Sequence, residues 1–151
     1  MQEHSGDSAG RDEELARLIA FYETLTPASV ARVADLYAAD AHFKDPFNEV
    51  RGTAAIGAIF THMFVQVLHP RFVVTNRMVQ GDQAFLAWNF HFRMKRFLRA
   101  EQCVRGATHV RFDQAGRVAL HRDYWDAAEE LYEKLPVLGG LMRVLKRAGR
   151  R

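Results

Sequence analysis

Carboxylate and imidazole side chains occur in this chain at positions from which they could transfer protons. Asp45 precedes Pro46 at the end of a short strand-like run, and His121 and Asp123 alternate along a later one. Side chains two residues apart on a strand share a face, so His121 and Asp123 should lie together. Each satisfies the other's hydrogen bonds, and such a pair can handle protons. A satisfied core pair, or a pair at a dimer interface, is the alternative interpretation.

The elements that must position these residues change from helices to strands along the chain. Leu15 to Leu25 has helical spacing, and Thr26-Pro27 should begin a second helix whose stripe includes Val30, Val33 and Tyr37. A third helix should follow Thr53 and end before Pro70. Strands are predicted over 71–80, 84–95, 102–112 and 117–125, then a short helix after Asp126 and a last helix over 137–147. Helices followed by an antiparallel meander indicate an α+β fold.

The two faces of the strand predicted over 84–95 differ sharply in polarity. One face carries Leu86, Trp88, Phe90 and Phe92, and the other carries Phe85, Ala87, Asn89, His91 and Arg93. This alternation predicts an apolar face under the helices and a wetter face opposite. Large side chains on the covered face can line a pocket or simply fill the core.

Three motifs carry a family resemblance. They are Tyr37-Ala-Ala-Asp40-Ala41, Asp45-Pro46, and Arg51-Gly52 followed by Ala55-Ile56. The sequence resembles the SnoaL-like and ketosteroid-isomerase-like branch of the NTF2-like superfamily. The resemblance implies a cone of N-terminal helices on a strongly curved antiparallel sheet, with a C-terminal helix near a pocket mouth. It also implies that Asp45 is the base and that His121 and Asp123 face the pocket. We expect one domain over residues 13–151, and the polar N-terminal residues 1–12 are predicted to be a disordered lead-in.

The implied pocket differs from that of the isomerases. Phe21 and Thr108 stand where those enzymes place a tyrosine and a protonated acid, and Tyr22 lies one residue off that face. One missing oxyanion donor costs ~10²–10³ in rate, so efficient steroid isomerisation is not expected. The expected ligand-binding residues are Phe21, Tyr22, Phe60, Met63, Phe64, Trp88, Phe90, Phe92, Thr108, Val110 and Trp125.

Two functions from different classes fit these residues. The first is a cofactor-independent enzyme that binds a small apolar carbonyl compound, steroid- or polyketide-like, and performs isomerase- or cyclase-type acid–base chemistry with Asp45. The second is a non-catalytic dimeric module for ligand binding or protein association. An epoxide-hydrolase-like reaction needs an arginine between Asp45 and Asp123. It ranks lower because Arg93, Arg111 and Arg122 fall on the outward register and Arg77 is ambiguous.

Composition and charge limit the number of domains, the cofactors and the partners that we expect. The 151 residues are 48% hydrophobic, enough for one core, and Cys103 is the single cysteine. We expect no metal, no cofactor, a cytoplasmic location and a homodimer through the convex sheet face. Basic residues gather in the last nine positions, which does not favour nucleic-acid binding. The helix over 137–147 is apolar on one side and basic on the other, so an anionic membrane surface is a weaker alternative to its capping the cone.

Overall fold

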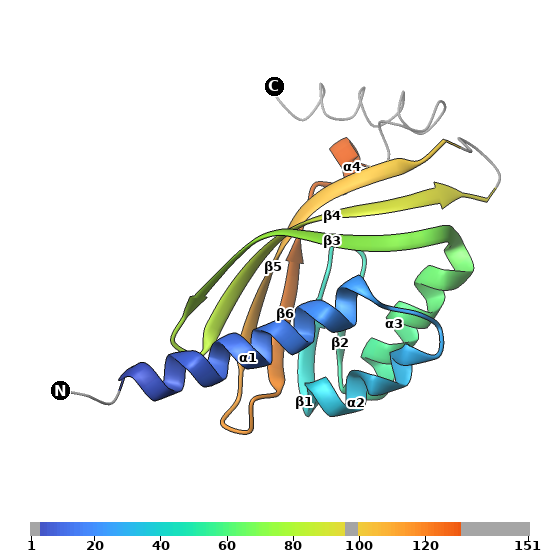
Figure 1. The fold of residues 1–151 in the computed structure, drawn as a ribbon. Coiled ribbons are helices and arrows are strands. Elements are labelled where there is room, and N and C mark those ends of the chain that lie inside the picture. Colours follow the sequence, from blue (N-terminus) through green and yellow to red (C-terminus); the bar gives the residue numbers. More distant parts are fainter. Residues whose placement is uncertain (1–3, 96–99, 131–151) are drawn as a thin grey trace, which may run out of the picture.

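The structure, a computed structural model, describes residues 4–95 and 100–130 (Figure 1). The last predicted helix and the basic tail lie outside these ranges. In chain order, the elements are α1 (His4–Glu23), the 3-10 helix η1 (Ser29–Arg32), α2 (Val33–Leu36), β1 (Tyr37–Lys44), β2 (Glu49–Arg51), α3 (Thr53–Gln66), β3 (Val67–Gln80), β4 (Gln83–Met94), β5 (Gln102–Phe112), β6 (Val118–Tyr124) and α4 (Ala127–Glu130).

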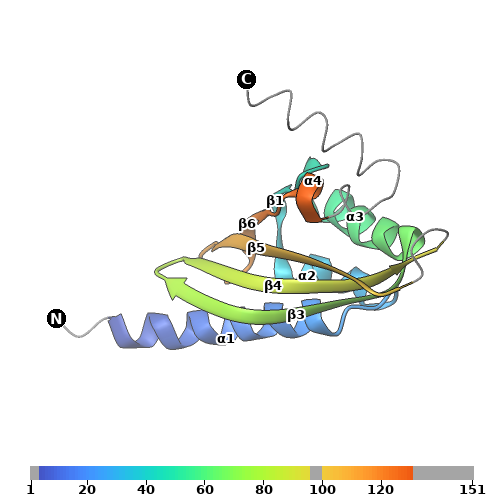
Figure 2. The ribbon, with the colours of Figure 1, turned by 90° about the horizontal axis from the view of Figure 1, so that it is seen from above.

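The six strands form one curved sheet in the order β2-β1-β6-β5-β4-β3. Neighbours are antiparallel except β1 and β6, which run parallel. Helix α1 runs along β3, and α3 lies across the open end of the curve, near α2 (Figures 1 and 2). Helices α1, α2 and α3 therefore lie on one face of the sheet, and these helices with a mostly antiparallel sheet confirm the predicted α+β class.

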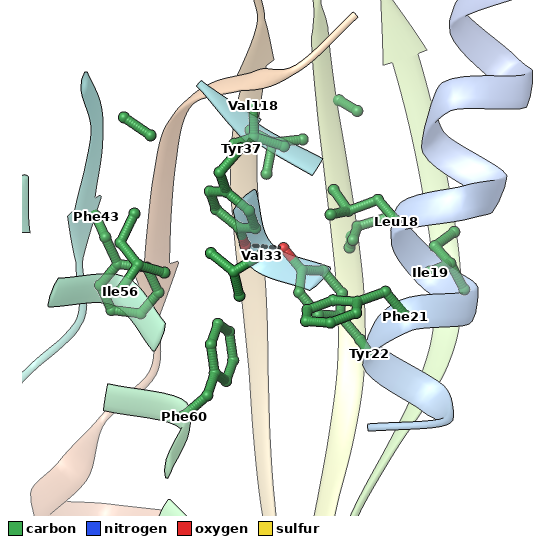
Figure 3. Close-up of a cluster of buried hydrophobic side chains, with 14 of the residues drawn as sticks. Leu18, Ile19, Phe21, Tyr22, Val33, Tyr37, Phe43, Ile56, Phe60 and Val118 are labelled. Carbon is green, nitrogen blue, oxygen red and sulfur yellow. Dashed lines mark hydrogen bonds between the residues drawn. The ribbon is translucent and has the colours of Figure 1, made fainter. Parts of the chain in front are cut away.

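The hydrophobic core lies between the helices and the concave face of the sheet. Helix α1 contributes Leu15. It also contributes Leu18 and Phe21, and α3 contributes Ile56 and Phe60 (Figure 3). The sheet contributes a larger set, which includes Tyr37, Phe43, Leu86, Trp88, Phe92, Val104, Val110 and Val118. In β4, Leu86, Trp88 and Phe92 are buried while Phe85 is 42% exposed. The predicted faces of this strand are therefore confirmed.

The second predicted helix is shorter than its spacing suggested. Helix α2 ends at Leu36, and Tyr37 has extended dihedral angles and begins β1. Tyr37 pairs with Val118 on β6 and its side chain is completely buried. The helical assignment of Tyr37 was wrong because its spacing from Val33 fits a helix, although the residue is an aromatic strand former.

Two other boundaries differ from the prediction. Strand β3 begins at Val67 and contains Pro70, at a register shift between Leu68 and Arg71. This strand is at the sheet edge, where a residue without an N–H group can be accommodated. At the other end of the chain, residues 4–12, which we expected within a disordered lead-in, belong to α1.

Candidate functional site

Strands β1, β5 and β6 bring the candidate site together. Phe43 on β1 is opposite His121 on β6, and Thr108 on β5 is opposite Asp123. These four side chains therefore share the concave face. The ring centroids of Phe43 and His121 are 4.5 Å apart. The sheet register thus places the polar pair His121 and Asp123 next to the ring of Phe43.

Asp123 is held from two sides by donors on the sheet. Thr108 Oγ1 donates a hydrogen bond to Asp123 Oδ1 at 2.6 Å, and His121 Nε2 lies 2.7 Å from the same oxygen. Trp88 Nε1 in turn donates to Thr108 Oγ1 at 2.7 Å. Because Thr108 has one hydroxyl proton, these two bonds determine its direction. The carboxylate of Asp123 therefore has a defined orientation.

The other ring nitrogen of His121 contacts two tyrosines from different elements. Its Nδ1 atom lies 3.0 Å from the hydroxyl of Tyr22 on α1 and 2.8 Å from that of Tyr37 on β1. A hydrogen bond also joins the two hydroxyls (Figure 3). The set Trp88, Thr108, Asp123, His121, Tyr37 and Tyr22 is hereafter the polar chain. It crosses the core from β4 to α1.

Exposure and charge vary along the polar chain. The His121 side chain is 4% exposed, whereas that of Asp123 is 18% exposed. Burial, followed by the charge of Tyr37, raises the pKa of Tyr22. Burial also raises the pKa of Tyr37, against a lowering hydrogen bond from Tyr22. Both hydroxyls therefore stay protonated at neutral pH. Asp123, in the middle of the polar chain, is the member whose side chain is partly open to solvent.

Asp45 occupies the turn after β1 and is half-buried. Its Oδ1 atom accepts hydrogen bonds from the backbone N–H groups of Phe47 and Asn48, at 2.8 and 2.6 Å. The Asn48 amide donates to both carboxylate oxygens at 3.1 Å. Asp45 therefore closes its own turn, as Asp commonly does before Pro. In the described ranges, no hydrogen bond joins Asp45 to His121 or Asp123.

The predicted ligand-binding residues separate into two groups by burial. Phe21, Tyr22, Phe60, Trp88, Phe92, Thr108 and Val110 are buried, and Met63, Phe64, Phe90 and Trp125 are partly buried. Many contact one another. The rings of Phe90 and Phe92 stack with centroids 5.2 Å apart, and Phe72 lies 4.5 Å from Phe90 and 5.7 Å from Trp88. Aromatic side chains thus occupy much of the interior of the cone.

Two hollows in the described chain lie away from these residues. One, of about 410 Å³, lies between α1 and β3 and is lined by Ile19, Glu23 and residues 74–77. The other, of about 240 Å³, lies between α1 and the β5–β6 turn. Neither is lined by Asp45, His121 or Asp123. Asp123 is partly exposed and lies two residues before the partly buried Trp125, whose ring centroid is 5.5 Å from that of Phe47.

The sequence did not reveal the roles of three residues in the polar chain. Tyr22 was placed off the pocket face, Tyr37 on a helix, and Thr108 at the position where the isomerases have a protonated acid. In the structure, Tyr22 and Phe21 are both buried against the concave sheet, and Phe21 packs edge-on against Phe60. One general rule could have indicated that Tyr22 and Tyr37 have polar partners: a buried tyrosine usually has a hydrogen-bond partner for its hydroxyl.

The arginines weighed for hydrolase chemistry are exposed. Arg93, Arg111 and Arg122 lie on the outward register as predicted, and Arg122 covers the ring of Tyr124 at 4.7 Å. Arg77 is also exposed and lines the hollow beside α1. Over residues 4–95 and 100–130, no group of three or more His, Cys, Asp or Glu side chains is arranged to hold a metal ion. No helix within those ranges is long and apolar enough to cross a membrane.

Comparison with known proteins identifies the family. The SnoaL-like domain matches residues 18–121, more than half of the chain, so the protein belongs to the SnoaL-like family. No curated protein is detectably similar to it in sequence.

Solved structures show the same fold at low sequence identity. A proposed SnoaL-like polyketide cyclase from a Jannaschia species is 18% identical, with a TM-score of 0.71 over 85% of this chain and 94% of that one. A ketosteroid-isomerase-like protein from Catenulispora acidiphila, in complex with trimethylamine, is 17% identical, with a TM-score of 0.68 over 79% and 89%. An epoxide hydrolase of M. tuberculosis is 14% identical, with a TM-score of 0.66 over 92% and 97%. The fold is therefore the NTF2-like cone.

Proposed function

We propose that this protein binds a small apolar carbonyl compound at Asp123, the partly exposed member of the polar chain, and transfers a proton on it. The observation that carries the proposal is the state of the Asp123 carboxylate. Its Oδ1 atom is held by Thr108 and His121, whereas Oδ2 accepts no hydrogen bond from the described residues. A fixed, partly exposed carboxylate oxygen beside aromatic side chains suits a general base.

This proposal moves the base from Asp45, where family resemblance suggested it, to Asp123. Both oxygens of Asp45 are engaged by Asn48 and the backbone of the same turn. Asp45 lies at the end of β1, and β1 is parallel to β6 with Lys44 opposite Arg122. It therefore stands at the same end of the sheet as Asp123, with its carboxylate engaged in its own turn.

The proposed chemistry begins at the carbon next to a carbonyl group. Asp123 Oδ2 removes a proton from that carbon, and the C–H electron pair moves into an enolate. Asp123 then returns the proton to a different carbon, which is an isomerisation. In the cyclase form, the enolate carbon instead forms a bond to a second carbonyl carbon of the same molecule, whose oxygen takes the proton.

The polar chain also bears on the substrate class. Thr108 donates its hydroxyl proton to Asp123, and Trp88 donates its N–H to Thr108. Neither proton is therefore available for an enolate oxygen. A substrate whose own second carbonyl stabilises the enolate, such as a 1,3-dicarbonyl compound of polyketide type, needs less help from the protein. This favours cyclase-type chemistry over steroid isomerisation.

Deuterium exchange tests the proposal without knowledge of the natural substrate. A panel of apolar 1,3-dicarbonyl compounds and enones would be incubated with protein in D2O, and NMR would follow deuterium entering beside the carbonyl. We expect acceleration for at least one compound, and a loss of roughly 10²-fold or more in Asp123→Asn, in the range of general-base contributions.

Asp45→Asn is the matched control, because the side-chain oxygen of asparagine can still accept the two backbone hydrogen bonds of the turn. It should keep most of the exchange activity. Loss in Asp45→Asn together with full activity in Asp123→Asn would return the role of base to Asp45. No acceleration by the wild-type protein across the panel would count against the enzyme proposal.

The alternative, a non-catalytic binding or association module, has its own supporting observation. Trp88 and Phe92 are buried, and Phe72, Phe90 and Phe92 stack inside the cone. A filled interior leaves less room for a substrate. Thermal shift with the same compounds separates the two functions: stabilisation without any deuterium exchange would support binding alone.

A further inference from the structure

The inner end of the polar chain carries two hydroxyl groups where one would satisfy the histidine. Tyr22 and Tyr37 both lie within hydrogen-bond distance of His121 Nδ1, at 3.0 and 2.8 Å, and they also bond to each other. The two come from α1 and β1, and both are buried. Burying two phenol groups beside one imidazole needs a physical reason, because each unpaired polar group in a core is unfavourable.

A count of protons shows which form of His121 this arrangement accepts. In the neutral form with its proton on Nε2, the ring donates to Asp123 and Nδ1 accepts from one tyrosine. The second tyrosine then donates to the oxygen of the first. Every donor has an acceptor. If Nδ1 also carried a proton, the two phenols would supply two further protons and only one of them would find an acceptor within the described chain.

The groups around His121 are consistent with this count. Tyr22 from α1, Tyr37 and Phe43 from β1, and Asp123 from its own strand contact the ring. Among these contacts Asp123 carries the charge, and its side chain is partly open to solvent, which screens its field. Since burial raises the pKa of both tyrosines, they remain neutral donors at neutral pH.

We propose that Tyr22 and Tyr37 are positioning residues that hold His121 as the neutral tautomer with its proton on Nε2. His121 then serves as a fixed donor to Asp123 Oδ1 rather than as a proton carrier. The catalytic consequence of this inference rests on the proposed function, in which Asp123 is the base. The protonation state of the His121 ring does not depend on that function. The pair is redundant, because either hydroxyl alone can reach Nδ1.

Nitrogen NMR of the histidine rings tests this directly in ¹⁵N-labelled full-length protein at about pH 7. We expect the wild-type His121 to show a protonated Nε2 and an unprotonated Nδ1 with the shift of a hydrogen-bonded acceptor. Tyr22→Phe and Tyr37→Phe should each keep this signature. In the double variant Nδ1 should leave the bonded-acceptor position, toward either a free or a protonated nitrogen. Tyr124→Phe, an exposed tyrosine on the convex face, is the matched control and should change nothing.

Two outcomes would overturn the inference. One is a proton on Nδ1 in the wild-type ring, and the other is an unchanged Nδ1 signal in a folded double variant. If the double variant does not fold, the wild-type and single-variant spectra still decide. The deuterium exchange assay keeps the two proposals apart. The expected spectra without exchange activity would remove the proposed function and leave the positioning role standing.

Discussion

Thr108 shows how one side chain can settle the geometry of a site. Its hydroxyl accepts from Trp88 and donates to Asp123, so it links a buried indole to a carboxylate at the edge of the core. In the isomerases the residue at this position donates to the oxyanion, and Thr108 could do so only with the same proton. A hydroxyl has one proton to give, and in this structure Asp123 receives it.

Replacing Thr108 with valine should therefore destabilise the protein although the shape is kept. The Trp88 N–H would lose its acceptor inside the core, and such an unpaired buried group costs about 1–3 kcal/mol. Urea denaturation monitored by tryptophan fluorescence measures the change. Thr75→Val is the control, because Thr75 is exposed and donates to Ala87 O at 3.2 Å; it should stay within about 0.5 kcal/mol. Equal stability of both variants would contradict the role given to Thr108.

At the scale of elements, some features were readable from the sequence and others were not. The alternation in β4 predicted which face is covered, because each side chain responds to the same sheet surface. The polar chain was not predictable, because Tyr22, Tyr37 and His121 come from three elements and meet only when β1 lies parallel to β6. Hydrophobic periodicity indicates which face of a helix or strand is buried, but not which other element packs against that face. Asp45 was recognised as a turn residue, but the bonds that occupy its carboxylate depend on the local backbone.

The pairing of β4 with β5 depends on the absence of a side chain at one position. Gly106 is opposite Trp88, and a Cβ atom there would lie 2.5 and 2.6 Å from two ring carbons of that tryptophan. The ring is held by its bond to Thr108, so it cannot move away freely. We expect Gly106→Ala to cost about 1–3 kcal/mol, the usual range for overpacking.

Gly10→Ala is the matched substitution for that experiment. Gly10 lies within α1, and an added Cβ would meet nothing within 4 Å. Because alanine is the better helix former, this variant should be more stable by about 0.5–1 kcal/mol. Thermal denaturation of both variants should therefore shift in opposite directions. A Gly106→Ala protein as stable as the wild type would show that the β4–β5 pair can relax around Trp88.

For the whole molecule, the convex face of the sheet is the surface that α1, α2 and α3 leave uncovered in the part of the chain that the structure describes (Figure 1). A row of cross-strand partners, Met78, Phe85, His109 and Arg122, runs over four strands of this face. Met78 is 69% and Phe85 42% exposed, and the ring of His109 stacks on Phe85 at 4.6 Å. Apolar side chains gathered on an open sheet face commonly mark a contact with another protein.

We therefore predict that two copies associate through this row. Light scattering should give about twice the monomer mass of 17.3 kDa. Phe85→Lys would place a charge in the middle of the row, where an interface buries it without a partner, so this variant should be monomeric. Val65→Lys adds the same charge at a 59% exposed position on α3, away from the sheet, and should leave the mass unchanged. A wild-type protein that stays at the monomer mass at micromolar concentration would refute association through this face. Equal dimerisation by Phe85→Lys would place the contact elsewhere, because the row cannot bury a lysine at its centre and keep the same affinity.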